Sequence, residues 1–381
     1  MMVIKDLPPI PLYKLLFYVL IIKLISIISV IVGLTGHCIY YTITETIHLI
    51  KIILYGNDDN AIKWENTKTL FDASKRTNEY YMLIIGSGFS GLGLAIKLNE
   101  IGMFNYMILE RHSRLGGTWH ANQYPGCACD VVSNLYSFSF QQNPNWSHYY
   151  SRQDEIWKYL EYCADKYHLM KNIQFNTNVS QCHWIEERQQ WRVTFNDNQY
   201  LYAQYLVGGY GPLSNAKYPD NIEGIRTFQG DQFHSANWDT SYLLDKKRVA
   251  VIGTGASAIQ IVPEIQKQVK QLFVFQRTPG WIVPREDRKV TEFEKKIFAY
   301  FPWIQKLVRG CLYWTYETTV LSFVYRWPLR HVLQMLMKYN LYSQVKDPEL
   351  RKKLTPKFEL GKVSFLSVNS DDSNEPMSVG Q

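Results

Sequence analysis

Residues 81–100 read YMLIIGSGFSGLGLAIKLNE, in which an apolar strand, a glycine-rich turn and a helix follow one another without a break. The strand is predicted at residues 81–85 and the helix at residues 92–100. The first glycine permits a tight bend, the second lets the backbone approach a pyrophosphate, and the third allows the helix to sit close to the strand. The residues predicted to bind phosphate are Gly86, Gly88, Phe89, Ser90 and Gly91.

A second strand, predicted at residues 106–109, ends in Glu110 and Arg111. Glu110 lies at the distance from the turn at which an acid accepts hydrogen bonds from a ribose diol. A glycine pattern alone is weak evidence, because a structural glycine loop explains it as well. With the strand, the helix and the acid all present, the sequence predicts an α/β domain that binds a dinucleotide.

A second turn of this kind, GTGASA, occupies residues 253–258. It lies between a predicted strand at residues 247–252 and a predicted helix at residues 258–269. The next predicted strand, residues 272–275, ends without an acid. Arg277 can instead pair bidentately with a ribose 2′-phosphate, although a solvated strand-end charge is the ordinary alternative. The second site is therefore predicted to bind NADPH through Gly253, Thr254, Gly255, Ser257, Ala258, Arg277 and Thr278.

Three further motifs carry a resemblance to a known family. LGGTW (residues 115–119), YPG (residues 124–126) and the pair Cys129-Asp130 resemble the FAD-domain signature of Baeyer-Villiger monooxygenases. FQGDQFHSANWD (residues 228–239) matches the pattern FxGxxxHxxxW[P/D], which tells this branch from other flavin monooxygenases. The resemblance implies an α/β fold with two dinucleotide-binding, Rossmann-like domains of the flavin monooxygenase and glutathione reductase type, with FAD in the first.

The resemblance also implies roles for particular residues. In relatives, the counterpart of Asp130 lies near the flavin ring, where it helps to position and charge-balance the site; on its own, Asp130 would equally be a loop cap. His234 and Trp238 complete the implied catalytic-site set, His234 as a structural and conformational residue rather than a base. The implied FAD ligands beyond the first turn are Glu110, Arg111, Gly117, Thr118, Trp119, Asp130 and Tyr136.

The activity implied by the resemblance is oxygen transfer driven by NADPH. The nicotinamide reduces the flavin, and one atom of O2 is inserted into a ketone or added to the sulfur or nitrogen of a thioether or amine. The chain departs from the family pattern after residues 347–356, where relatives continue into a Gly-Cys-Lys-Arg stretch whose Arg serves the flavin site. Here the sequence reads FELGK (residues 358–362). The alternative is therefore a truncated, catalytically inactive, membrane-tethered remnant that binds nucleotides.

An apolar stretch at residues 15–35, interrupted by Lys23, is long enough to span a bilayer. A helix lying in the membrane interface and a signal peptide are the alternatives. Residues 39–55 have apolar positions at helical spacing and are expected to form an amphipathic helix. The chain is thus expected to be anchored to the endoplasmic reticulum or another intracellular membrane, with its catalytic region facing the cytosol.

Composition excludes several other classes. The net charge is +7, and Lys and Arg are scattered, so no nucleic-acid footprint is present. The six cysteines include no CxxC pair, which argues against a disulfide framework, a zinc site or a disulfide reductase. Cys127 and Cys129 are expected to serve packing, and no metal site or oligomeric state is predicted.

The remaining sequence predicts the domain order. A three-strand antiparallel meander is expected at residues 179–184, 191–195 and 200–207, and a helix capped by Ser151 is expected at residues 151–168. Residues 293–342 should form two or three helices separated at Pro302 and Pro328. The predicted divisions are the membrane anchor and amphipathic helix (1–56), a linker (57–79), the FAD domain without its C-terminal part (80–225), the fingerprint linker (226–240), the incomplete NADPH domain (241–290), a helical insertion (291–345), and the truncated end of the NADPH domain with a disordered tail (346–381).

Overall fold

A computed structural model describes residues 78–219, 222–285, 287–324, 329–358, 360 and 366–369. The predicted membrane segment at residues 15–35, the amphipathic stretch at residues 39–55 and the polar tail lie outside the described residues. Among the helices that the structure does describe, none combines the length and apolar content needed to cross a bilayer. Contacts divide the chain into two compact units, one containing Thr291–Tyr339 and the other containing residues 78–290 with Asn340–Lys357 and residues 366–369.

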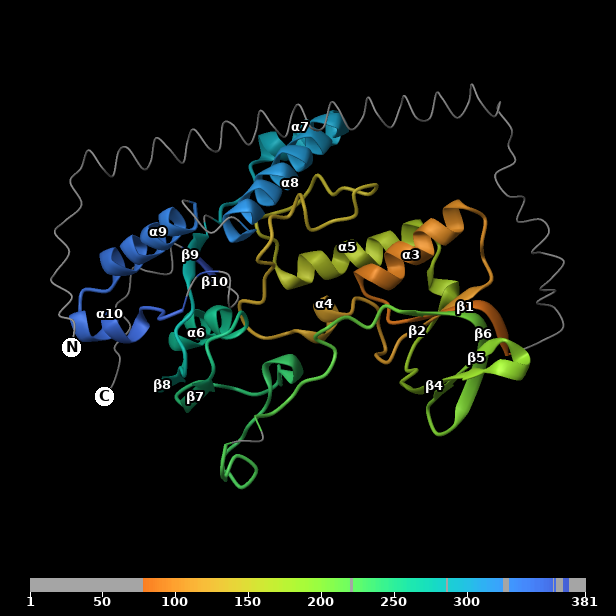
Figure 1. Ribbon diagram of the computed structural model, residues 1–381, viewed down its shortest axis with the longest axis horizontal. Coiled ribbons are helices and arrows are strands. Elements are labelled where there is room, and N and C mark those ends of the chain that lie inside the picture. Colours follow the sequence, from red (N-terminus) through yellow and green to blue (C-terminus); the bar gives the residue numbers. More distant parts are fainter. Residues whose placement is uncertain are drawn as a thin grey trace. The chain divides into compact units, whose positions relative to one another are not determined.

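The first glycine turn belongs to a six-stranded sheet with strand order β3-β2-β1-β6-β5-β4. Four strands run parallel, namely β1 (Glu79–Ile85), β2 (Tyr106–Leu109), β3 (Ile173–Gln174) and β6 (Gln199–Gly208). Helix α3 (Phe89–Glu100) connects β1 to β2, which parallel pairing requires (Figure 1). The predicted strand, turn and helix are confirmed, and the helix begins three residues earlier than expected because the turn itself supplies its first residues.

Apolar side chains on the two faces of this sheet form separate cores, because neighbouring strand residues point to opposite faces. Ile84 and Ile108 pack on the face covered by α3 and α5 (Gln153–Lys166), which lie side by side in Figure 1. Leu83 and Leu109 pack on the other face, against β5 and β6. All four side chains are almost wholly buried. Burying each one stabilises the fold by roughly 1.5–3 kcal/mol.

The meander is confirmed as three antiparallel strands, β4 (Val179–Ile185), β5 (Gln190–Phe195) and β6. A short 3-10 helix, Glu186–Arg188, joins the first two strands, and another, Met170–Asn172, precedes β3. The sequence did not predict that β6 pairs in parallel with β1. This pairing places the end of the meander directly beside the strand that carries the first glycine turn.

The predicted cap of the helix after residue 151 is wrong. Helix α5 begins after Arg152 and has no side-chain cap. The Ser151 hydroxyl instead lies 2.6 Å from the Ser133 hydroxyl. Acidic residues Asp154 and Glu155 occupy the first turn, where their charges favour the positive end of the helix dipole.

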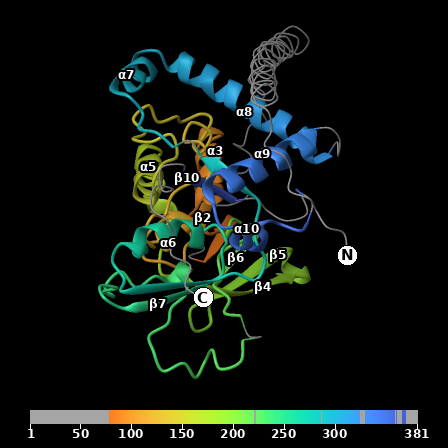
Figure 2. The same ribbon diagram turned by 90° about the vertical axis from the view of Figure 1, so that its left-hand side faces the viewer.

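The second glycine turn lies in a β-α-β unit. Strands β7 (Arg248–Ile252) and β8 (Gln271–Phe275) pair in parallel, and α6 (Ala258–Gln266) connects them. Ile261 and Ile265 of α6 are buried in the same apolar cluster as parts of β7 and β8. Figures 1 and 2 show α6 against these strands. The predicted elements are confirmed, with the helix ending three residues sooner than expected.

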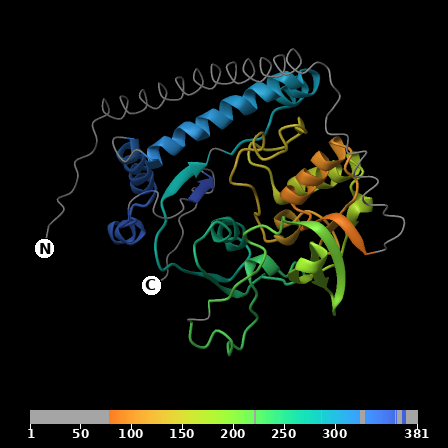
Figure 3. The same ribbon diagram turned by 45° about the vertical axis from the view of Figure 1, so that its right-hand side comes forward.

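After β8 the chain forms β9 (Ile282–Arg285), which pairs in parallel with β10 (Leu366–Asn369), as Figure 3 shows. Three helices follow β9, as predicted for residues 293–342: α7 (Glu292–Tyr300), α8 (Pro302–Val324) and α9 (Leu329–Gln344). Thr291 and Glu294 form a capping box on α7, and Pro302 opens α8. Helix α10 (Pro348–Leu354) is capped by Asp347.

Candidate functional site

The first glycine turn leaves no room for side chains. A Cβ atom on Gly91 would lie 2.0 Å from the Gly86 carbonyl oxygen, and one on Gly86 would lie 2.7 Å from the Gly209 carbonyl oxygen. Gly117 faces Gly88 so closely that its Cβ would lie 3.0 Å from the Gly88 Cα atom. Three backbone segments therefore meet at this turn, which is the close approach predicted for a phosphate-binding loop.

Both predicted nucleotide turns lead into helices with uncapped N-termini. Neither α3, which follows Gly88, nor α6, which follows Ser257, has a side-chain cap or an acidic residue in its first turn. By contrast, α7 and α10 are capped by Thr291 and Asp347. Helix α5 is also uncapped, but its first turn carries the acidic residues Asp154 and Glu155. The first N–H groups of a helix have no partner within it and attract anions. The two uncapped termini fit the pyrophosphates of two dinucleotides.

Glu110 holds the end of β2 against the first turn. The residue is 4% exposed, and one carboxylate oxygen accepts hydrogen bonds from the Ser87 N–H (2.9 Å) and the Ser87 hydroxyl (2.6 Å). The other oxygen accepts from the His112 N–H at 2.9 Å. A carboxylate offers about four lone-pair positions, so room remains for a further donor such as a ribose hydroxyl. The role of Glu110 as a ribose ligand remains a prediction, whereas sequence reasoning overlooked its partner Ser87.

Three of the predicted FAD residues form one aromatic group. The Tyr136 ring packs edge-on against Phe89 at 5.1 Å and against Trp119 at 5.3 Å. The Trp119 indole N–H donates to the Tyr136 hydroxyl at 3.1 Å, and burial raises the pKa of Tyr136 to about 12. Thr118 and Trp119 lie in the short helix α4 (Thr118–Ala121). The structure thus gathers residues far apart in sequence beside the first turn.

Arg111 is exposed and already engaged. Its guanidinium donates to the Ser214 carbonyl and to the Asn215 side chain (3.2 Å), while Nε donates to His112 (3.1 Å). These bonds tie the end of β2 to the chain that follows β6.

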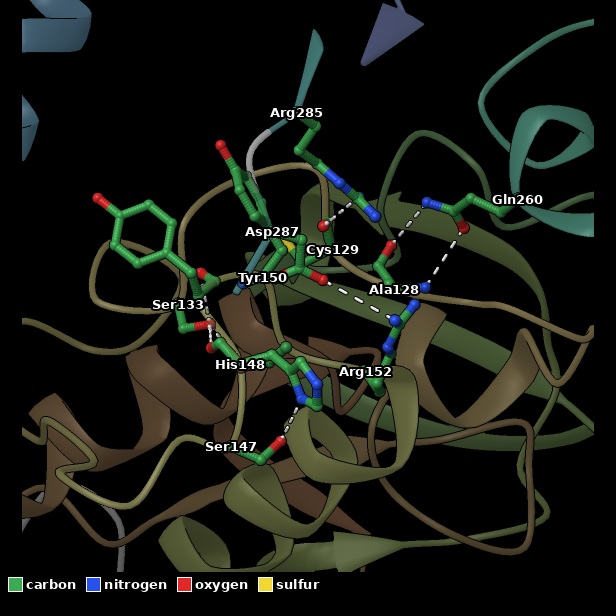
Figure 4. Close-up of polar contacts among 12 residues, drawn as sticks. Ala128, Cys129, Ser133, Ser147, His148, Tyr150, Arg152, Gln260, Arg285 and Asp287 are labelled. Carbon is green, nitrogen blue, oxygen red and sulfur yellow. Dashed lines mark hydrogen bonds and ion pairs between the residues drawn. The ribbon is translucent and has the colours of Figure 1, made fainter. Parts of the chain in front are cut away.

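Asp130 follows a short extended segment that is hydrogen-bonded along both edges. On one edge, the Cys129 N–H donates to the Ser151 carbonyl, and the Gln153 N–H donates to the Cys127 carbonyl, both at 2.9 Å. On the other edge, the side-chain amide of Gln260 donates to the Ala128 carbonyl (3.0 Å) and accepts from the Ala128 N–H (3.3 Å), as Figure 4 shows. Residues 127–129 are therefore fixed by several bonds.

The carboxylate of Asp130 itself is exposed and, within the described part of the chain, makes no hydrogen bond. The preceding thiols belong to the packing, as predicted. Burial raises the pKa of Cys127 to about 11 and that of Cys129 to about 12, which keeps both protonated near neutral pH. The segment thus presents an available carboxylate on a fixed backbone.

Arg285, at the end of β9, reaches the same segment. The residue is 5% exposed, and its guanidinium donates to the Cys129 carbonyl at 3.1 Å (Figure 4). Burial lowers the pKa of Arg285, and the nearby Asp287 opposes that shift. Asp287 accepts from the Tyr150 N–H at 3.1 Å and pairs with Arg152 at 3.8 Å.

Sequence reasoning missed both Gln260 and Arg285. For Arg285, the available signal was a charged run directly after an apolar strand. For Gln260, it was an amide in the first, otherwise apolar turn of a helix. Neither signal predicts which residue the side chain contacts, because each contact joins residues more than a hundred positions apart.

The second turn is open where the first is closed. A Cβ atom on Gly253 or on Gly255 would have nothing within 4 Å, and Gly253 needs its glycine only for a φ of +103°. The Gln276 side chain donates to the Thr254 hydroxyl at 2.9 Å, which joins the turn to the end of β8. Arg277, one residue further, is exposed, as is Thr278. The open space beside Gly255 and the exposed side chains that follow β8 fit a ligand with an additional phosphate.

The fingerprint residues mainly hold their own segment together. His234 Nδ1 accepts from the Ala236 N–H at 3.0 Å and so caps a 3-10 helix, Ser235–Asn237. The Trp238 ring packs against Phe233 at 5.0 Å. Among the described residues, no hydrogen bond joins His234 or Trp238 to Asp130, so their membership of the catalytic site stays a prediction.

Comparisons with known proteins agree with this arrangement. The family described as flavin-binding monooxygenase-like matches residues 80–325. A Baeyer-Villiger monooxygenase of Pseudomonas aeruginosa is 47% identical over 278 residues, covering 73% of this chain and 53% of that protein. A Baeyer-Villiger monooxygenase of Streptomyces coelicolor is 45% identical over 278 residues, with the same coverage.

Among solved structures, cyclohexanone monooxygenase from Rhodococcus sp. Phi1 bound to NADP+ matches with a TM-score of 0.67 and 27% identity. That match covers 78% of this chain and 64% of that chain. The chain spans about half the length of the curated relatives it matches. Its turns, its fingerprint and these matches together show that the chain belongs to the flavin-binding monooxygenase-like family, within the Baeyer-Villiger group.

Proposed function

We propose that the chain is the FAD- and NADPH-binding part of a monooxygenase that inserts one oxygen atom of O2 into a ketone, or adds it to the sulfur or nitrogen of a thioether or amine. The observation that carries this proposal is the pair of uncapped helix N-termini behind two glycine turns. The charge beside each turn differs, with the buried carboxylate of Glu110 at the first and the exposed guanidinium of Arg277 at the second.

At the first turn, the N–H groups of α3 would hold the FAD pyrophosphate, and Glu110 would accept from the ribose. The aromatic group of Phe89, Trp119 and Tyr136 would line the approach to the flavin. Bound FAD would supply the redox centre that takes a hydride from NADPH and passes electrons to O2. Asp130 would then hold its negative charge beside that centre.

At the second turn, the N–H groups of Ser257 and Ala258, which precede the hydrogen-bonded Ile259 and Gln260, would bind the NADPH pyrophosphate. Arg277 would pair with the 2′-phosphate, which a carboxylate at the same strand end would repel. The closed packing of the first turn has no counterpart here. Together with the strand-end charges, this supports FAD at the first turn and NADPH at the second.

Cofactor binding and turnover test the proposal. The purified chain, incubated with FAD and freed of excess, should be yellow and should oxidise NADPH in preference to NADH. Cyclohexanone and methyl phenyl sulfide serve as ketone and thioether probes, and each molecule of lactone or sulfoxide should consume one NADPH. A chain that retains no FAD would contradict the proposal, whereas cofactor binding without turnover would support the inactive, membrane-tethered remnant.

We further infer that residues 1–56 attach the chain to an intracellular membrane, with residues 80–290 on the cytosolic side. Only the apolar sequence at residues 15–35 supports this inference. The full chain should remain in the membrane pellet after an alkaline carbonate wash, and protease added outside sealed microsomes should digest residues 80–290. Release by the wash would contradict a spanning anchor.

A further inference from the structure

The second glycine turn is connected through its own helix to the segment that carries Asp130. Gln260 is the third residue of α6, and its N–H donates to the Ser257 carbonyl, within the turn, at 3.1 Å. The neighbouring Ile259 N–H donates to the Gly255 carbonyl at 3.2 Å. A displacement of the turn when it binds a phosphate would therefore move the backbone of Gln260.

The side chain of Gln260 carries this connection onward. Its amide pairs with both the N–H and the carbonyl of Ala128, as a neighbouring strand would. Its oxygen also accepts from the Tyr124 hydroxyl at 3.2 Å. Burial strongly raises the pKa of Tyr124, so its hydroxyl stays protonated as a donor. The Gln260 side chain thus joins the start of α6 to residues 124–128.

Close backbone packing strengthens this connection. Gly126 lies against α6, where a Cβ atom would come within 2.6 Å of the Gln260 carbonyl oxygen and 2.8 Å of Glu264 Cγ. On the far side, Ser151 and Gln153 pair with residues 127–129, and Arg285 binds the Cys129 carbonyl (Figure 4). Because so many bonds fix the segment, a shift at Ala128 is passed to the next residues rather than absorbed.

We propose that Gln260 is a positioning residue that couples occupancy of the second nucleotide turn to the placement of Asp130 beside the first. The proposal rests on the proposed function, in which NADPH occupies the second turn and Asp130 lies beside the flavin. By linkage, the coupling acts in both directions, so each cofactor changes the affinity for the other by the same factor.

The first test measures that coupling in the FAD-loaded chain. NADP+ should perturb the visible flavin band, and NADP+ affinity should differ about fivefold or more between the FAD-loaded and FAD-free chains. Gln260→Met keeps the length and helix preference of the side chain but removes both hydrogen-bonding groups. In this variant, each cofactor should still bind alone within about threefold of its original affinity, while the spectral change and the coupling factor are lost.

Two matched variants separate coupling from general damage. Gln266→Met, at the other end of α6, makes the same chemical change away from residue 128 and should leave the coupling intact. Gln260→Glu keeps an acceptor for the Ala128 N–H but repels the Ala128 carbonyl, so it should restore only part of the coupling. An unchanged spectral response in Gln260→Met would overturn the proposal.

Hydrogen exchange gives a readout that needs neither flavin nor turnover. NADP+ should slow exchange in a peptide covering residues 124–132 of the FAD-free chain, and Gln260→Met should abolish this slowing. No effect of NADP+ on that peptide in the unsubstituted chain rejects the inference. Failure of the chain to take up FAD, with the exchange effect present, rejects the proposed function alone.

Discussion

The two glycine turns share a sequence pattern, but one is closed by protein and the other is open. At the first turn, a Cβ atom on Gly86 or Gly91 would collide with backbone atoms, and Glu110 is buried among hydrogen-bond partners. At the second, a Cβ atom on Gly255 meets nothing, and Arg277 stands in solvent. The same glycine motif is thus required by backbone packing at the first turn, whereas packing leaves room for a side chain at Gly255 in the second.

The largest effect should come from adding one methyl group to each turn. Gly91→Ala would place its Cβ 2.0 Å from the Gly86 carbonyl oxygen, so the backbone must move. We expect a loss of about 3 kcal/mol or more in the free energy of unfolding. The thermal midpoint should then fall by about 6–12 °C.

Gly255→Ala is the matched control, because neither glycine has a positive φ and a Cβ atom at Gly255 meets nothing within 4 Å. It should unfold within about 1 kcal/mol of the unsubstituted chain but bind NADPH more weakly. Equal losses of stability in the two variants would remove the contrast between a closed and an open turn.

A smaller effect, confined to one cofactor, is expected at Arg277. Arg277→Gln should weaken NADPH binding about tenfold to a hundredfold, because a charge-assisted hydrogen bond contributes roughly 1.5–3 kcal/mol. NADH binding and thermal stability should not change. Isothermal titration with both nucleotides measures the difference, and Lys267→Gln, an exposed charge on the same unit, controls for charge loss. A similar loss for NADH would show that Arg277 does not read the 2′-phosphate.

The smallest effect should be a pH dependence of stability near the closed turn. Burial is the main cause that lowers the pKa of His120, and the same holds for His112, whose ring lies 5.4 Å away. His120 Nδ1 is also buried without a hydrogen-bond partner among the described residues. Since the folded state binds these protons less readily than the unfolded state, stability is full above about pH 6.5 and falls as the pH drops below it.

Denaturant unfolding measured at several values between about pH 5 and pH 8 checks this slope. His120→Phe keeps an aromatic ring beside Trp157, 5.2 Å away, but removes the titrating group. It should therefore flatten the dependence. A slope that His120→Phe leaves unchanged would assign the effect to other groups.

Local sequence patterns predicted most of the elements around the site, whereas long-range contacts were beyond them. The strands and helices flanking both turns follow from apolar runs and glycine spacing, and the end of β2 at Leu109 was predicted to the residue. The aromatic grouping of Phe89, Trp119 and Tyr136 is in keeping with the family resemblance. Those signals are all contained within short windows of sequence.

The contacts of Gln260 and Arg285 could not be predicted in this way, because their partners lie 132 and 156 positions away. The assignment of Ser151 as a helix cap failed for a similar reason. Its hydroxyl is hydrogen-bonded to that of Ser133 instead of to the start of α5. A rule based on neighbouring residues does not take such a contact into account.

The parallel pairing of β6 with β1 also has a consequence for synthesis of the chain. The Gly209 N–H donates to the Ile85 carbonyl at 2.8 Å, and the Gly209 carbonyl oxygen is the atom that crowds Gly86. During synthesis, the edge of β1 that pairs with β6 must therefore stay unpaired until more than a hundred further residues have emerged from the ribosome. Such delayed pairing slows folding and leaves an apolar edge exposed in the meantime. The nascent chain is thus open to aggregation, and to capture by chaperones, until β6 is made.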